Sequence, residues 1–113
     1  MHEFSVAQNI VEIVSKSFVK SGADRIISVE IDVGTLSGVV IDALDFAMDS
    51  AKKETPLERA SIKMYNITAN ARCNNCKREF ELNDFFSVCP YCNSVSFVII
   101  TGKELKVISI EVE

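Results

Sequence analysis

The sequence predicts an α+β fold in which two helices pack on a three-stranded mixed sheet, with a zinc-ribbon-like module inserted before the last strand. Two stretches have apolar residues at helical spacing, and three have the alternation of half-buried strands. Four cysteines gather between residues 73 and 92. We expect one α/β domain from residues 1–71 plus 103–113 and a second, metal-binding domain from residues 72–102.

The first helix is predicted to begin at Ser5. Ser5 and Gln8 have the spacing of a capping box, in which each side chain bonds the other residue's backbone N–H. Ser21-Gly22 marks the C-terminal end. Between these limits one wide face of the helix is apolar, formed by Val6, Ala7, Ile10, Val11, Ile13, Val14 and Phe18.

Residues 25–33 alternate between apolar and polar side chains, which predicts a half-buried strand. Its apolar face consists of Ile27, Val29, Ile31 and Val33. A loop at residues 34–38 leads to a second helix from about residue 39 to residue 53. The acidic residues near its start and the basic residues near its end suit the helix dipole. Its apolar stripe consists of Ile41, Leu44, Ala47, Met48 and Ala51.

Residues 61–69 and 105–112 are the remaining predicted strands of the first domain, and residues 97–100 form a short apolar run. In the last strand Ile108, Ile110 and Val112 share one face. Leu105 and Val107 are out of phase with them, so we expect a β-bulge. A last strand that follows an insertion can exchange between chains, so we expect a monomer, or a weak or strand-swapped dimer.

Composition argues against two classes of partner. The chain has 12 basic and 16 acidic residues and a net charge of -4, whereas nucleic-acid binders usually carry a basic surplus. No apolar run approaches the roughly 18 residues of a membrane span, and the N-terminus lacks the pattern of a signal peptide. We therefore expect a cytoplasmic protein without nucleic-acid or membrane partners, whose thiols stay reduced.

The cysteines form two C-x-x-C pairs, Cys73 with Cys76 and Cys89 with Cys92, separated by twelve residues. This spacing predicts one tetrahedral zinc site, with a redox dithiol, disulfide pairs or a rubredoxin-like iron site as alternatives. A closed four-thiolate site has no open position for substrate, so the metal is expected to be structural. A segment this small would owe much of its folding free energy to that metal.

The other candidate site is the N-terminus, where His2 is the only histidine of the chain. The Met1 amine, the His2 backbone nitrogen and the His2 imidazole can close chelate rings on one ion, and Glu3 offers a fourth donor. Planar, nitrogen-rich donor sets favour nickel(II) or copper(II) over zinc. The partial positive charge of a helix N-terminus opposes such binding, and an ordinary mobile terminus is the competing interpretation.

Several segments, taken in order, resemble the HypA/HybF family of nickel-insertion metallochaperones over essentially the whole chain. They are Met1-His2-Glu3, Leu36-Ser37-Gly38-Val39, Ala43-Leu44-Asp45-Phe46-Ala47, Thr55-Pro56-Leu57-Glu58, the two C-x-x-C pairs, Gly102-Lys103-Glu104-Leu105 and Ser109-Ile110-Glu111-Val112.

The resemblance implies nickel(II) as transported ion, bound by Met1, His2 and Glu3 with His2 essential, and structural zinc(II) bound by the four cysteines. It also implies delivery to the large subunit of nickel-iron hydrogenase, help from the GTPase HypB, urease and its accessory proteins as further partners, and no enzymatic activity. The alternative function is a zinc-ribbon adaptor for protein or nucleic acid with no role in nickel transfer.

The sequence departs from the family pattern at a few places. Glycines are usual where Glu54, Lys77 and Asn93 stand, and the latter two directly follow the C-x-x-C pairs. Asparagine tolerates the left-handed backbone conformation, and lysine tolerates it less well. No histidine accompanies the cysteines, so a histidine-linked pH response of the zinc site is not expected.

Overall fold

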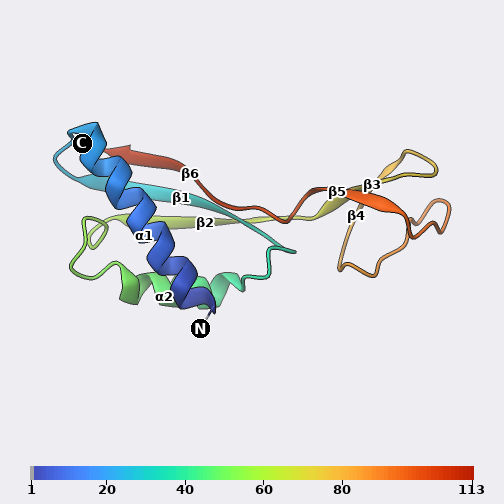
Figure 1. The fold of residues 1–113 in the computed structure, drawn as a ribbon, viewed down its shortest axis with the longest axis horizontal. Coiled ribbons are helices and arrows are strands. Elements are labelled where there is room, and N and C mark those ends of the chain that lie inside the picture. Colours follow the sequence, from blue (N-terminus) through green and yellow to red (C-terminus); the bar gives the residue numbers. More distant parts are fainter. Residues whose placement is uncertain (1) are drawn as a thin grey trace.

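The structure is a computed structural model that describes residues 2–113, which form two helices and two three-stranded sheets. The molecule is elongated, 54 × 27 × 17 Å, with the two sheets at opposite ends (Figure 1). The helices are α1 (His2–Ser21) and α2 (Ile41–Ala51). In residues 2–113, neither helix has the length and hydropathy that crossing a membrane requires.

The larger sheet confirms the predicted mixed topology. Its strands are β2 (Ser61–Ile67), β1 (Ile26–Gly34) and β6 (Leu105–Val112), in that spatial order. The central strand β1 runs parallel to β2 and antiparallel to β6. Parallel neighbours require a crossover connection, and α2 supplies it between β1 and β2. The smaller sheet consists of β4 (Glu79–Glu81), β3 (Asn70–Cys73) and β5 (Phe97–Thr101), all antiparallel.

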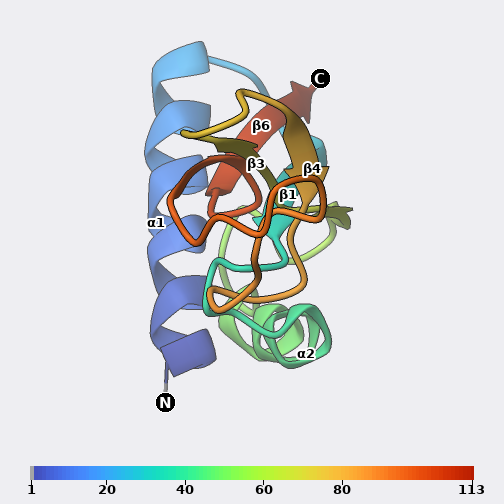
Figure 2. The same ribbon diagram turned by 90° about the vertical axis from the view of Figure 1, so that its right-hand side faces the viewer.

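Both helices bury their apolar stripes against one face of the larger sheet (Figures 1 and 2). The predicted stripe of α2 is confirmed, since Leu44, Ala47 and Met48 are buried and Ile41 and Ala51 pack at its margin. The buried members from α1 and β1 are Ala7, Ile10, Val11, Val14, Ile26, Val29, Ile31 and Val33. A separate apolar core, centred on Ala71, Phe80 and Leu82, supports the smaller sheet.

The predicted start of the first helix is wrong, because α1 begins at His2 rather than at Ser5. No proline or glycine precedes Ser5, so nothing in the chain stops the helix from extending to its N-terminal residues. Glu3 lies in the first turn, where its negative charge suits the helix dipole.

The β-bulge predicted for the last strand is confirmed. Glu30 pairs with Ser109 and Ile31 pairs with Val107, so Ile108 is the extra residue and lies exposed. A second irregularity lies on β1, where Ile26 pairs with Val112 and Ser28 pairs with Glu111, so Ile27 is the extra residue. As a result Ile26, not the predicted Ile27, enters the core.

Two glycines hold the junction between the sheets, because backbone segments touch there. The Gly34 N–H donates to Glu104 O at 2.7 Å, and the Leu36 N–H donates to Gly102 O at 2.7 Å. Leu36 also packs against the core of the smaller sheet. The smaller sheet spans Asn70 to Thr101, close to the expected domain of residues 72–102, and the division into two domains stays a prediction.

Replacing Gly34 with alanine is expected to destabilise the protein by about 2–3 kcal/mol, because the new Cβ would lie 2.1 Å from Gly102 O and the backbone would have to move. The matched control is Gly22→Ala, which meets open space and carries only the strain of φ +71°, about 1 kcal/mol. Urea denaturation of both variants measures the free energies of unfolding. Equal losses of unfolding free energy in the two variants would contradict the close backbone contact between Gly34 and Gly102.

Candidate metal centre

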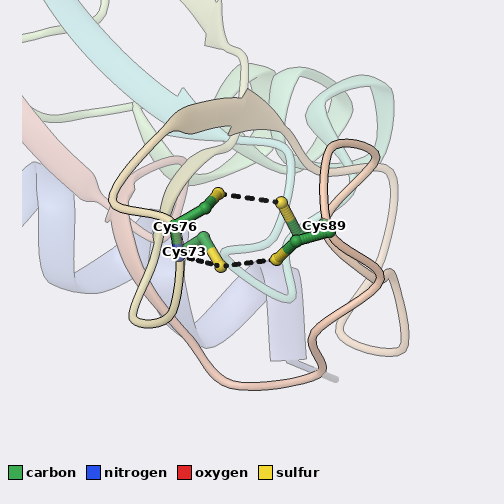
Figure 3. A group of neighbouring side chains, drawn as sticks. Cys73, Cys76 and Cys89 are labelled. Atoms are coloured by element: carbon green, nitrogen blue, oxygen red, sulfur yellow. Dashed lines mark hydrogen bonds between the residues drawn. The ribbon is translucent and has the colours of Figure 1, made fainter.

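The four cysteines converge on one point at the far end of the smaller sheet (Figure 3). Their Sγ atoms all lie within 4.8 Å of one another, with Cys73 and Cys92 3.5 Å apart and Cys76 and Cys89 3.6 Å apart. Cys73 and Cys89 are buried, and the other two are half-buried. Both predicted pairs therefore meet in a single cluster that forms a metal-binding site.

The spacing of the sulfurs fits a tetrahedral ion. Zinc–sulfur bonds of about 2.3 Å place the sulfurs of a regular tetrahedron about 3.8 Å apart, close to the separations found here. A disulfide requires about 2.05 Å, so the cysteines are not paired as disulfides. Four thiolates around one ion fill a tetrahedral coordination shell, which leaves no position for a substrate.

Each C-x-x-C pair is shaped by a tight turn. The Lys77 N–H donates to Cys73 O at 3.0 Å, and the Asn93 N–H donates to Cys89 O at 2.8 Å. Lys77 has φ +66° and Asn93 has φ +62°, both in the left-handed region. The left-handed region favours glycine, and lysine tolerates it less well than asparagine does, so Lys77 is under backbone strain.

Lys77→Gly is therefore expected to stabilise the metal-loaded protein by about 0.5–1 kcal/mol, because glycine relieves the left-handed strain but loses more entropy on folding. The same substitution at Lys16, in the middle of α1, is the control and should destabilise by about 1 kcal/mol. Thermal unfolding of both variants with metal bound measures the difference. Destabilisation by Lys77→Gly would show that the lysine side chain makes up for the strain.

Local surroundings shift the pKa values of Cys73 and Cys76 in opposite directions. The backbone amides of Cys76 and Asn75 donate to Cys73 Sγ, at 3.4 Å and 3.3 Å, and lower the pKa of Cys73 to about 6. For Cys76 the Arg78 amide lowers the pKa, but burial and the neighbouring thiols of Cys89 and Cys73 outweigh it and raise the pKa to about 11. A metal ion that enters the cluster would displace the remaining protons.

The second candidate site lies at the start of α1, beside the start of α2 (Figures 1 and 2). His2 Nδ1 is 3.9 Å from Glu3 Oε2, and their side chains are 62% and 19% exposed. Met1, the third predicted nickel ligand, lies outside the described residues. The structure thus places His2 and Glu3 together in the first turn of α1.

One contact at this site was not expected from the amino-acid sequence. The Val40 N–H, at the N-cap of α2, donates to Glu3 Oε2 at 3.4 Å. The Glu3 backbone N–H, the Val40 N–H and the nearby His2 lower the pKa of Glu3, because each favours the ionised carboxylate. Because a backbone N–H makes the contact, no side-chain pattern could have revealed it.

The chain is similar to known proteins over its whole length. Residues 1–112 match the family model described as "Hydrogenase/urease nickel incorporation, metallochaperone, hypA". The chain is 42% identical to the hydrogenase maturation factor HypA of Parabacteroides distasonis, over all of this chain and 98% of that protein. It is 41% identical to the hydrogenase maturation factor HypA of a Nostoc species, over all of this chain and 96% of that protein.

Two solved structures share the fold. The solution structure of the Ni metallochaperone HypA from Helicobacter pylori has a TM-score of 0.69 at 22% identity, covering 97% of this chain and 96% of that one. A second solution structure of a HypA protein has a TM-score of 0.74 at 23% identity, covering 100% of this chain and 97% of that one. Both match over the larger and the smaller sheet alike.

Proposed function

Because the chain belongs to the HypA family of hydrogenase/urease nickel incorporation metallochaperones, we propose that it binds nickel(II) through Met1, His2 and Glu3 and delivers the ion to nickel-iron hydrogenase. The observation that carries this proposal is the family match over residues 1–112, a range that includes Met1, His2 and Glu3. The position of His2 beside Glu3 at an exposed helix start supports it.

The chemistry of capture needs nitrogen donors and a way to offset the helix dipole. The Met1 amine, the His2 backbone nitrogen and the His2 imidazole are the proposed nitrogen donors, and binding releases their protons. Glu3 brings a negative charge to a helix end that otherwise repels cations. Its hydrogen bond to Val40 fixes the direction of the carboxylate. Binding should therefore weaken as the solution is acidified.

The exposed position of the site suits release as well as capture. The His2 side chain is 62% exposed. A receiving protein that offers more metal ligands can therefore contact the nickel ion while His2 still binds it. We propose that the chain works in this way without catalysing a reaction. Its proposed partners are the large subunit of nickel-iron hydrogenase, the GTPase HypB and, where urease is a client, urease accessory proteins.

The cysteine cluster is proposed to hold a structural zinc ion through Cys73, Cys76, Cys89 and Cys92. Zinc would hold the turns of the two C-x-x-C pairs together. Few other contacts join these two parts of the chain; one of them is the hydrogen bond that Asn74 Nδ2 donates to Ser96 Oγ at 2.9 Å. We further propose that residues 72–102 form the metal-dependent domain predicted from the sequence, with residues 1–71 and 103–113 as the nickel-binding domain.

Transfer of nickel tests this function directly. Protein loaded with zinc and one equivalent of nickel is mixed with purified immature hydrogenase large subunit in the presence of a chelator that holds free nickel. Nickel should appear in the large subunit faster from the loaded protein than from the nickel–chelator complex alone. Equal rates would contradict delivery and favour the adaptor function.

A further inference from the structure

An apolar groove lies between the start of α1 and the outer side of α2. It has a volume of about 360 Å³ and is lined by Phe4, Ala43, Phe46, Ala47 and Ser50. The Phe46 side chain is 79% exposed, although phenylalanine on a helix surface is costly to leave in water. Val40, which precedes α2, is 61% exposed. The helix therefore presents an unpartnered apolar surface.

The charged residues within α2 are all acidic. Asp42, Asp45 and Asp49 are exposed and, at i, i+3 and i+7, follow the side of Phe46 that faces away from the groove, where Asp42 and Asp45 line a separate hollow with Met64. No lysine or arginine occurs within α2. Of these three aspartates, Asp49 forms an ion pair within the part of the chain that the structure describes. Its partner is Lys52 Nζ at 4.0 Å, and an exposed pair at this distance contributes little. Phe46 thus stands between the apolar groove and an acidic side of α2.

This charge decides which occupant the groove fits. A second copy that docked through the same face would bring aspartates against aspartates, and like charges across an interface cost several kcal/mol. A cationic segment with an apolar side chain would meet the aspartates with opposite charge and cover Phe46. Aromatic residues in the centre of an interface are typical anchors of binding.

The groove also adjoins the proposed nickel site. Phe4 lines it and directly follows His2 and Glu3 in α1, and Val40, which bonds Glu3, precedes its α2 wall. A protein bound in this groove would be held next to the proposed nickel site of this chain. Its own metal-binding side chains would then be present at a high effective concentration beside the ion.

We propose that Phe46 and the aspartates of α2 form the docking surface for a cationic, amphipathic segment of the protein that receives nickel. This inference rests on the proposed function, because it names the kind of partner that the same site serves. Phe46 fills an apolar depression of the partner, and Asp42, Asp45 and Asp49 contact lysine or arginine side chains. The contact should weaken as ionic strength rises.

Site-specific photo-crosslinking tests which protein lies on the groove. The probe is p-benzoylphenylalanine placed at position 46, in cells that mature their own hydrogenase, with position 16 on α1 as the control. We expect a crosslink from position 46 to a partner peptide with net positive charge and an apolar residue, identified by mass spectrometry. No crosslink above the control, a crosslink to an acidic segment, or a crosslink to a second copy would overturn the proposal.

The Phe46→Ala variant separates docking from metal binding. We expect the rate of nickel transfer to purified large subunit to fall at least tenfold, while nickel affinity changes less than twofold. Val19→Ala, an exposed apolar residue of α1, is the control and should change neither quantity. Unchanged transfer by Phe46→Ala would overturn the docking surface. Absence of nickel binding by the wild type would instead reject the proposed function.

Discussion

Cys73→Ser is expected to release the metal and to unfold residues 72–102 while the larger sheet stays folded. Cys73 is fully buried, and its sulfur accepts hydrogen bonds from the Asn75 and Cys76 amides. The apolar core of the smaller sheet has few members, namely Ala69, Ala71, Cys73, Phe80, Leu82 and Cys89. Structural zinc contributes roughly 10–16 kcal/mol in small zinc-binding peptides, so its loss should exceed what this core can supply.

Zinc analysis and amide hydrogen exchange measure this result. The wild type should hold one zinc per chain and protect the amides of β3 and β5, whereas Cys73→Ser should lose both the metal and this protection. Val95→Ser, at a position that is 76% exposed on the same module, is the matched control and should change neither. Retained protection without zinc would contradict a metal-dependent module.

His2→Ala is expected to weaken nickel binding by more than about 100-fold. Even residues that only support a metal ligand contribute about 10–100-fold to affinity, and His2 is proposed to supply two donors. Its side chain is exposed, so the substitution should leave the free energy of unfolding within about 0.5 kcal/mol of the wild-type value.

Competition with a chromophoric chelator measures the nickel dissociation constant of each variant. Gln8→Ala is the control, because Gln8 is likewise exposed on α1 but lies about one and a half turns beyond His2 and Glu3. The control should bind nickel as the wild type does. A His2→Ala variant that binds as tightly as the wild type would show that the tripeptide is not the nickel site.

Much of the fold follows from local periodicity. The stripe of α2 and the bulge at Ile108 were predictable, because each depends on side-chain order along one element. The start of α1 was not, because a capping pattern at Ser5 does not exclude an earlier start, and Glu3 suits the first turn of the helix. The burial of Ile26 in place of Ile27 depends on register with β6, which local alternation does not reveal.

The candidate sites differ in the same way. The cysteine cluster was predictable because the ligands come as two local pairs whose spacing suits one ion. The chelating potential of Met1, His2 and Glu3 was also visible in the sequence. The Val40 contact and the groove at Phe46 were not, since both depend on how α2 lies against the start of α1.

The most direct test of nickel binding at the N-terminus is X-ray absorption at the nickel edge, on protein that carries one zinc and one nickel. The account predicts nickel surrounded by nitrogen and oxygen donors, with zinc surrounded by four sulfurs. Nickel surrounded by thiolate sulfur would contradict it, because the ion would then occupy Cys73, Cys76, Cys89 and Cys92 instead of the N-terminal tripeptide.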